Sequence, residues 1–300
     1  MHTTTRFALT LALLTALVMT GTGCRPKSPA STQAPDPPTT TPAATISTPA
    51  PTSAADTNAP TPAAKSVQTR AYFVRGEMIT VAGRTANSAA VASEAMKALL
   101  AGPTPAEKSA GIGTQIPAGT KLLGVVVSGG TATVNLSKRF ESGGGSLSMT
   151  LRVAQVVSTL TQFPSVQSVA FKLDGVLTDS IGGEGLIVSP PVSRADYESV
   201  MPAILVEAPI PGQAVGRPMG VFGTANVFEA QFRVQVRDRT GKVIADTPVT
   251  ASSGTGTRGT FRARISYPGG HAGPGTIRFF EPSAKDGTPT NVVNVPVTLR

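Results

Sequence analysis

The sequence predicts an α+β domain, with helices on a mostly antiparallel sheet, followed by an all-β immunoglobulin-like sandwich, both behind a disordered N-terminal linker. Three observations support this fold class. Residues 25–65 hold ten Pro, ten Ala and nine Thr, and such a segment lacks the apolar residues that a core needs. Residues 66–190 mix helical and strand periodicity, whereas residues 200–300 keep only the two-residue period of strands.

The chain begins with the pattern of an exported protein. Residues 1–23 contain a basic residue, Arg6, and then an apolar run from Phe7 to Met19, which is typical of a signal peptide. The run is too short to span a bilayer, which takes about 20 residues. Cys24, the only cysteine, follows at once. This arrangement resembles the bacterial lipoprotein signal, which implies cleavage before Cys24 and acylation of that residue, with palmitate as a typical acyl group.

An ordinary secretory signal is the alternative. Gly21 and Gly23 fit the small-residue rule for general signal cleavage, and Gly21 stands where lipoprotein signals usually carry an aliphatic residue. An unpaired thiol is a liability in an exported protein, and this favours lipidation of Cys24. We therefore expect a protein on the outer face of the cytoplasmic membrane, anchored by lipid, with secretion as the alternative.

Residues 24–65 are expected to form a disordered linker between the anchor and the folded part. A segment of this length spans about 35 Å as a flexible coil and about 125 Å as a polyproline II rod. Its Thr and Pro content also permits O-glycosylation. The expected role is a tether that holds the folded part away from the membrane surface.

The α+β domain, expected over residues 66–190, begins with strands and a helix. Apolar residues within 71–81 predict two short strands or one bent strand. Apolar residues at helical spacing between Val91 and Leu100 predict a helix capped by Ser88.

Two local motifs follow in the same domain. Thr104 and Glu107, with Pro105 between them, form a capping box that predicts a short helical turn. Two β-branched runs, 122–127 and 131–136, are separated by a serine and two glycines and predict a β-hairpin.

The last part of the domain repeats this order. Gly143–Gly145 precede a helix that Ser146 is expected to cap and Pro164 to end. The three glycines provide either a flexible turn or an anion cradle at the helix N-terminus. Strands are expected at 166–173 and 175–177.

The second domain, expected over residues 200–300, alternates apolar and polar residues. Phe232, Val234 and Val236 mark the inner face of one strand, and 261–267 and 293–299 repeat the pattern. Seven or so short strands of this kind fit an immunoglobulin-like sandwich. Without a Cys pair or Trp, its core must consist of aliphatic and Phe side chains.

Proline positions refine the sandwich. Pro248 and Pro296 lie within strand patterns, and proline cannot donate a ladder hydrogen bond. Both are therefore expected on edge strands.

Longer stretches resemble two known families in sequence. Residues 95–111, 116–137 and 140–175 are similar to the GerMN domain of sporulation and spore germination proteins. Residues 206–238 and 259–268 resemble the immunoglobulin-like domain of bacterial spore germination. The resemblance implies an envelope lipoprotein, related in architecture to proteins that assist the assembly or positioning of envelope complexes. A sporulation role does not transfer with the fold.

Catalytic motifs are scarce in the sequence. His271 is the only histidine after the signal peptide and lies in a Gly-rich loop between expected strands. A Ser-His-Asp system needs a serine on a strained turn, and no such motif is present. Zinc sites need several His or Cys ligands. We therefore expect no enzyme activity, no metal site and no cofactor.

Carboxylates are the remaining candidates for acid-base chemistry. Glu141 precedes the glycine turn, and Asp174, Asp179 and Glu184 follow the last expected strand of the first domain. The three later residues form either a solvated loop or a Ca²⁺ or carbohydrate site, although their spacing differs from an EF-hand.

Four arginines form the other candidate site. Arg233, Arg237, Arg262 and Arg264 lie on the solvent side of expected strands, where they form a possible interaction face for anionic wall polymers or an acidic protein surface. The alternative is that they only keep an exposed sheet soluble and protect strand edges.

The net charge of +9 is spread along the chain without a basic tract, so we expect no nucleic-acid partner. The favoured function is a non-catalytic, membrane-anchored envelope module that binds envelope proteins, peptidoglycan or anionic wall polymers. One alternative is a cell-wall hydrolase or its regulator that uses carboxylates such as Glu141 and Asp174. Another is a carrier of lipophilic ligands, with a cavity between the helices and sheet of the first domain.

Overall fold

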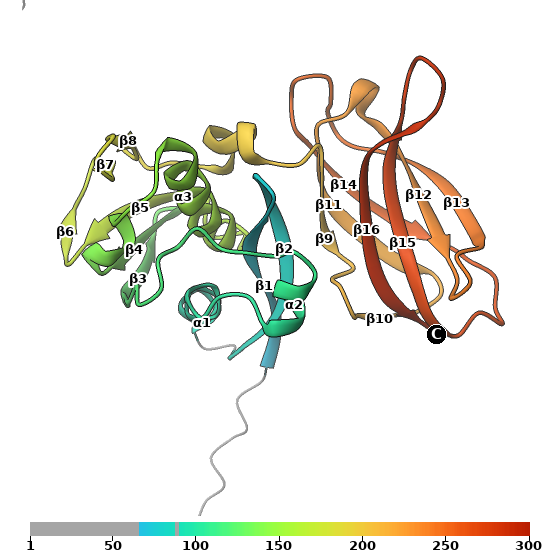
Figure 1. The fold of residues 1–300 in the computed structure, drawn as a ribbon, viewed down its shortest axis with the longest axis horizontal. Helices are drawn as coiled ribbons and strands as arrows, with labels where there is room; N and C mark the ends of the chain where they lie inside the picture. Colours follow the sequence, from blue (N-terminus) through green and yellow to red (C-terminus); the bar gives the residue numbers. More distant parts are fainter. Residues whose placement is uncertain (1–65, 88–89) are drawn as a thin grey trace, which may run out of the picture. The chain divides into compact units, whose positions relative to one another are not determined.

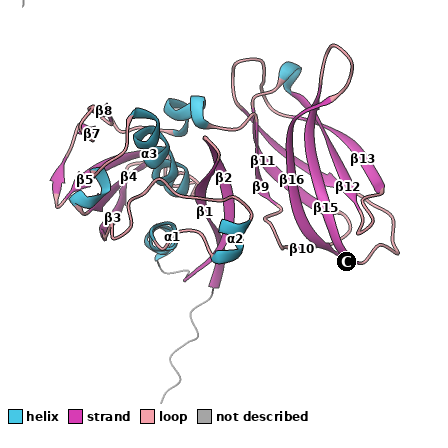
Figure 2. Cartoon of the chain, viewed as in Figure 1, coloured by secondary structure: helices cyan, strands magenta, loops and turns pink. Residues whose placement is uncertain are grey.

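The computed structural model describes residues 66–87 and 90–300, all within one compact unit, Pro60–Arg300. The predicted signal peptide, Cys24 and the linker lie outside the described residues. Within the described part, an α+β arrangement is followed by an all-β sandwich (Figures 1 and 2), which confirms the predicted fold class. None of the helices described is long and apolar enough to cross a membrane.

A long β-hairpin opens the first domain. Strands β1 (Ser66–Arg75) and β2 (Met78–Asn87) are antiparallel along their whole length, joined by a turn in which Gly76 has a φ of 60°. The sequence predicted shorter strands here. From Ala71 to Val74 both faces of β1 are buried, so no alternation of apolar and polar residues marks its full length.

The helices follow the predicted order. They are α1 (Val91–Leu100), α2 (Pro105–Ser109) and α3 (Ser146–Leu160). The predicted capping box of α2 is confirmed, because the Thr104 N–H donates to Glu107 Oε2 at 2.8 Å and the Glu107 N–H donates to Thr104 Oγ1 at 3.3 Å. The predicted cap of α1, Ser88, lies outside the described residues.

The cap of α3 differs from the prediction. Gly145 occupies the N-cap position and Ser146 is the first helical residue. The Ser146 hydroxyl donates to the Glu184 carboxylate, so it is not available for a backbone N–H of its own helix. The helix ends at Leu160, before the predicted stop at Pro164.

A four-stranded sheet completes the first domain. Its strands are β3 (Leu122–Ser128), β4 (Thr131–Leu136), β5 (Ser168–Leu173) and β6 (Val176–Leu177), in that spatial order. Only β4 and β5 are parallel, because α3 provides the crossover between them. The predicted hairpin of 122–127 with 131–136 is confirmed.

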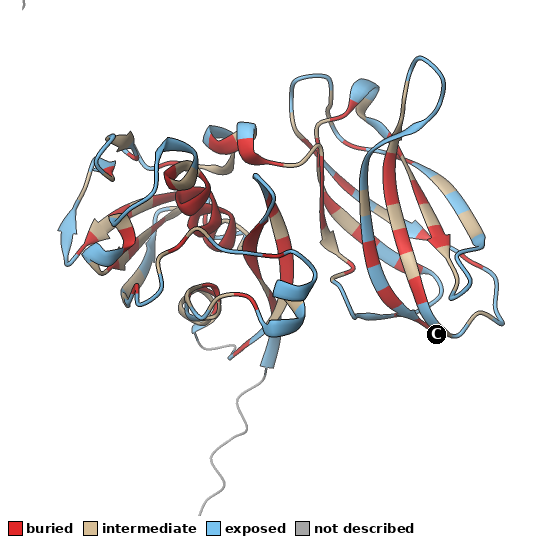
Figure 3. Cartoon of the chain, viewed as in Figure 1, coloured by how far each residue is buried: buried red, intermediate tan, exposed pale blue. Residues whose placement is uncertain are grey.

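Short elements fill the remaining connections. They are the 3₁₀ helices η2 (Lys138–Glu141) and η3 (Arg194–Val200) and the small hairpin of β7 (Ser180–Ile181) with β8 (Leu186–Ile187). Phe140 of η2 stacks on Phe171 of β5, with ring centroids 6.1 Å apart. The core of the first domain lies between α1 and α3, the hairpin and this sheet. From Leu151 to Leu160 every residue of α3 is buried, and Figure 3 shows most of this helix in the colour of buried residues.

The sandwich consists of two sheets. One has the order β14-β11-β9 and the other β10-β16-β15-β12-β13. The strands are β9 (Ile204–Ala208), β10 (Ala214–Val215), β11 (Met219–Ala225), β12 (Gln231–Arg237), β13 (Val243–Thr250), β14 (Gly259–Ile265), β15 (Gly273–Pro282) and β16 (Pro289–Leu299), with the short η4 (Phe228–Ala230) before β12.

Phenylalanines form the centre of the sandwich core. Phe232 and Phe261 meet edge to face with centroids 4.8 Å apart, and Phe279 lies 6.5 Å from Phe232. Pro248 lies on an edge strand, β13, as predicted. Pro296 does not, because the two-residue β10 pairs with the end of β16. The domain boundaries expected at 66–190 and 200–300 stay a prediction.

Candidate functional site

One side of α3 is polar and yet buried. Gln155, Ser158 and Thr159 are fully buried and Arg152 is 3% exposed, while Gln162 one turn further is half-buried. Most of these positions recur at intervals of three and four, so they share one helix face. The sequence prediction noted only the apolar stripe of this helix, although the polar spacing was visible beside it.

The polar face of α3 closes the outer edge of β1. Gln162 accepts a hydrogen bond from the Arg70 N–H at 2.9 Å and donates to the Arg70 carbonyl at 2.7 Å. At Tyr72, the N–H donates to Thr159 Oγ1 at 3.2 Å and the carbonyl accepts from Gln155 Nε2 at 3.1 Å. These side chains satisfy the edge groups of β1 as a neighbouring strand would.

Arg152 binds the glycine turn in front of its own helix. Its guanidinium donates to the carbonyls of Phe140 at 2.5 Å, Gly143 at 3.0 Å and Gln115 at 2.9 Å, and has no acidic partner among the described residues. Burial lowers the pKa of Arg152. Gly143 and Gly144 have φ values of 65° and 86°, so these glycines provide left-handed turn geometry that presents carbonyls to the arginine.

A buried ionic cluster joins the first domain to the sandwich. Arg194 Nη1 of η3 lies 2.6 Å from Glu207 Oε1 of β9. The Tyr72 hydroxyl of β1 donates to the same carboxylate at 2.5 Å and accepts from Arg194 Nη2 at 3.0 Å. Arg70 Nε donates to the Glu207 carbonyl at 2.8 Å. The cluster therefore connects the closed edge of β1 to the first strand of the sandwich.

The pKa values in this cluster follow from burial and from the ion pair. Burial by itself raises the pKa of Glu207, but the Arg194 charge and the Tyr72 hydrogen bond together hold it below its usual range. Burial raises the pKa of the Tyr72 hydroxyl well above its ordinary value. Glu207 is thus an anion and Tyr72 a neutral donor at neutral pH.

A cavity of about 690 Å³ lies between the β1–β2 hairpin and the sandwich. Its walls come from β2, α2, the segment from β9 to Pro211, and β16. Apolar side chains provide most of the lining, among them Ile79, Val81, Leu205, Ile210 and Val293. A size of several hundred Å³ and a mainly apolar lining are usual for binding sites, which often occur between domains.

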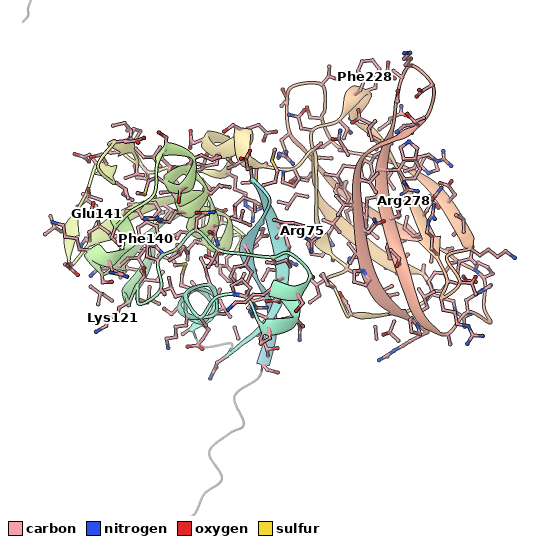
Figure 4. All side chains as sticks on the ribbon, viewed as in Figure 1. Arg75, Lys121, Phe140, Glu141, Phe228 and Arg278 are labelled. Carbon is pink, nitrogen blue, oxygen red and sulfur yellow. The ribbon has the colours of Figure 1, made fainter. Side chains whose placement is uncertain are left out.

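Few charged groups line this junction cavity. Arg84 and Glu107 form a bidentate pair at 2.7 and 2.8 Å. The hydrogen bond from Arg84 is the main reason that the pKa of Glu107 is lowered. Arg75 lies at the tip of the hairpin (labelled in Figure 4), is exposed, and has no ion-pair partner among the described residues. Arg75 is therefore the cationic group available to an anionic ligand in this cavity.

Close packing fixes one wall of the cavity. A Cβ atom placed on Gly83 of β2 would lie 2.1 Å from Ile210 Cδ1, so a larger residue at position 83 would require the Ile210 side chain to move. The larger cavity found thus lies at the junction, not between the helices and sheet of the first domain, where the lipophilic-carrier alternative placed it.

The four arginines of the predicted interaction face lie in two pairs on different sheets. Arg233 and Arg237 are on β12, whereas Arg262 and Arg264 are on β14. The alternation predicted that each faces away from the core, but it held no information about which sheet each strand joins. The structure does not bring the four together into one face.

Each pair has local partners. Arg233 Nε lies 2.8 Å from Asp246 Oδ1, and Arg237 Nη2 donates to Gln235 Oε1 at 2.9 Å. Arg262 stacks over the Phe222 ring at 5.0 Å. A binding role for any of these arginines stays a prediction, as does lipidation of Cys24.

The candidate acid-base residues are scattered. Glu141 lies 4.0 Å from Lys138 within η2, and Asp174 is an exposed turn residue with a φ of 46°. Glu184 accepts a hydrogen bond from the Ser146 hydroxyl at the start of α3. His271 Nδ1 lies 3.3 Å from Asp238 Oδ2. No group of three His, Cys, Asp or Glu side chains in the described ranges has a geometry suited to a metal ion.

Comparison with known proteins identifies both domains. Residues 56–179 match the family model Germane, described as sporulation and spore germination. Residues 203–288 match Gmad2, described as the immunoglobulin-like domain of bacterial spore germination. No curated protein matches the chain.

Several solved structures are similar to parts of the chain. A candidate lipoprotein from Clostridium perfringens is 22% identical, with 45% of this chain and 93% of that chain covered and a TM-score of 0.34. The first GerMN domain of the sporulation protein GerM from Bacillus subtilis is 25% identical, covering 43% and 99%, with a TM-score of 0.35.

The tandem GerMN domains of the same protein are 17% identical over 67% of this chain and 62% of that chain, with a TM-score of 0.37. The two family matches confirm the resemblance seen in the sequence. This chain therefore carries a Germane (GerMN) domain followed by a Gmad2 immunoglobulin-like domain.

Proposed function

We propose that this protein is a non-catalytic, lipid-anchored module of the cell envelope that binds another envelope component in the cavity at its domain junction. The observation that carries the proposal is the junction cavity itself, about 690 Å³ in volume and framed by both domains. The domain pair, known from sporulation and germination proteins, supports an envelope role. Cys24 and the linker behind it supply the expected anchor and tether.

The buried cluster of Arg194, Glu207 and Tyr72 supports binding at this place. Because these groups are mutually satisfied at 2.5 to 3.0 Å, separating β1 from β9 would cost this ion pair and its hydrogen bonds. The walls of the cavity are therefore preorganised, and a partner does not have to order them.

The lining indicates the chemistry of the partner. Apolar walls favour an apolar segment, and Arg75 favours an acidic group at the hairpin end. An acidic protein segment or an anionic wall polymer with an apolar portion fits both features. A catalytic role has less support, because the candidate carboxylates Glu141 and Asp174 lie in separate surface elements.

Crosslinking in intact cells tests the binding site. A photoreactive residue at Val292, which lines the cavity, is compared with one at Val243 on β13; both side chains are 39% exposed. We expect a discrete crosslinked partner from position 292 only. Equal crosslinking at both positions, or none at 292, would contradict the proposal.

A charge reversal at Arg75 sharpens this test. Arg75→Glu is expected to reduce the crosslink at least severalfold, whereas Arg239→Glu on an exposed turn leaves it unchanged. Loss of the crosslink in both variants would indicate a general effect of net charge.

The anchor is tested separately. Cys24→Ala is expected to move the protein from the membrane to the soluble fraction, because stable anchoring needs two or more acyl chains. If the variant stays with the membrane as firmly as the parent, the anchoring proposal is wrong. Incubation with purified peptidoglycan tests the hydrolase alternative, for which soluble fragments would be the positive result.

A further inference from the structure

The sheet of the first domain ends in an unusual edge strand. β3 (Leu122–Ser128) pairs with β4 on one side and with no other described strand on the other side. Its sequence, LLGVVVS, contains no charge and no proline. Leu123, Val126 and Val127 are 49%, 66% and 40% exposed, and no residue of β3 is buried, whereas every second residue of β4 is.

Three other strand edges in the described part are protected. The outer edge of β1 is covered by polar side chains of α3. On the sandwich, β14 carries Arg262 and Arg264, and β13 carries Pro248. Charges, prolines and covering elements are the usual means by which proteins prevent edge-to-edge pairing. β3 has no charge and no proline, and helix α1 is the helix that packs against it.

The backbone of β3 is ready for such pairing. Gly129 and Gly130 form a two-residue turn with φ values of 55° and 82°, so Ser128 and Thr131 are the hydrogen-bonded pair that closes the hairpin. By alternation, Val125 and Val127 direct their N–H and C=O groups away from β4. No hydrogen bond joins these groups to other described residues.

We propose that β3 pairs antiparallel with β3 of a second copy of this chain, about a two-fold axis at Val125, so that one continuous sheet crosses both copies. Such an interface is isologous and closes at two copies. The pairing places Val126 opposite Gly124 of the second copy. A Cβ atom built on Gly124 has no other atom within 4 Å, so this position has room for the large Val126 side chain.

The absence of charge on β3 permits a second copy at this edge. The chain carries a net charge of +9, but β3 itself is uncharged, so two copies of this strand meet without like-charge repulsion. Lys121, just before β3 (labelled in Figure 4), comes opposite Gly129 of the second copy in this register. No like charges face each other along the paired strands.

The expected affinity is modest. Pairing along one seven-residue strand buries less than the roughly 1,200 Å² of a standard stable interface, so we expect a dissociation constant on the order of 10 to 100 μM. Confinement on a membrane surface would raise the local concentration and favour the dimer.

Sedimentation equilibrium of the purified full-length protein in mild detergent tests the dimer. All samples carry Cys24→Ser, which removes the native thiol as a route to dimers. Over a range of about 1 to 500 μM we expect a monomer-dimer equilibrium. Val126→Lys should weaken it at least tenfold, and Val243→Lys, at an exposed position of β13, should not. A monomer at all concentrations, species larger than two copies, or equal loss in both variants would overturn the proposal.

Disulfide trapping tests the register. Gly124→Cys and Val126→Cys are each made in the Cys24→Ser background and then mixed. Facing residues of a non-hydrogen-bonded antiparallel pair lie close enough for a disulfide. We expect the mixture to form far more disulfide dimer than either variant alone. Equal yields from all three samples would refute the two-fold axis at Val125, and a Val243→Cys sample measures random collision.

Discussion

The outer strand edges of β1 and β3 in the first domain differ in whether their backbone groups have hydrogen-bond partners. At β1, the edge is closed by Gln155, Thr159 and Gln162 of α3, which bond the backbone of Arg70 and Tyr72. At β3, the edge backbone of Val125 and Val127 has no described partner. An edge that folding must bury is satisfied internally, whereas an edge left bare and uncharged remains available for another strand.

The two strand edges also have different roles in the molecule. The β1 side continues through Tyr72 into the buried cluster with Arg194 and Glu207, so it holds the two domains together. The β3 side takes no part in that cluster. We therefore expect substitutions on the β1 side to change stability, and substitutions on β3 to change association.

The largest effect is expected at Glu207. Glu207→Gln leaves the buried Arg194 guanidinium without its anion, which lowers the free energy of unfolding by about 3 kcal/mol. Urea denaturation at neutral pH measures the change. A loss below about 1 kcal/mol would mean that the cluster is well hydrated and contributes little.

The same residue gives a pH dependence. Because Glu207 has a lowered pKa in the folded protein, its contribution is complete above the ordinary glutamate pKa of 4.5. The contribution is lost as pH falls below that value through the lowered pKa of the folded state. The difference in stability between the parent and Glu207→Gln should therefore shrink on acidification from pH 6 to pH 3. A constant difference would contradict the assigned ion pair.

Gln155→Leu is the next largest change. The substitution keeps similar volume but leaves the Tyr72 carbonyl and the Gln115 N–H without their partners, which costs about 2 to 3 kcal/mol. Thermal and urea unfolding measure it. Ser109→Leu, at an exposed position of α2, is the control and should change stability little.

A smaller effect is expected at Thr159. Thr159→Val retains the shape and removes only the acceptor for the Tyr72 N–H, so the loss should be about 1 kcal/mol. Hydrogen exchange of the Tyr72 amide should accelerate in step. If the amide stays as protected as in the parent, α3 does not close the edge of β1 through this hydroxyl.

The smallest effect on stability is expected on β3. Val126→Lys replaces a side chain that is 66% exposed, so stability of the monomer should change by less than about 0.5 kcal/mol. Unfolding measured at low protein concentration isolates the monomer. A large loss there would show that Val126 supports the fold, and any effect on association would then be indirect.

Local signals in the sequence predicted the elements that depend on neighbouring residues. The capping box of Thr104 and Glu107 and the hairpin of β3 with β4 are specified within a few residues. The alternation of Phe232, Val234 and Val236 likewise predicted β12 and its inner face. In each case the interacting residues, or the alternation of apolar and polar residues, lie within one short segment of the chain.

Contacts between distant segments were not accessible in the same way. Tyr72, Arg194 and Glu207 meet only after folding, and the sequence around each of them gives no sign of the other two. The polar face of α3 had a visible helical spacing, but the same pattern is usual for a solvent-facing side. The arginine pairs failed to meet because alternation gives a direction for each side chain and no sheet assignment.

Amide hydrogen exchange at two protein concentrations tests the contrast between the two edges most directly. We expect the Arg70 and Tyr72 amides to be protected at both concentrations, because α3 side chains accept their hydrogen bonds. We expect the Val125 and Val127 amides to exchange rapidly in dilute protein and slowly in concentrated protein. Slow exchange at Val125 and Val127 in dilute protein, or no dependence on concentration, would contradict the open edge and its pairing.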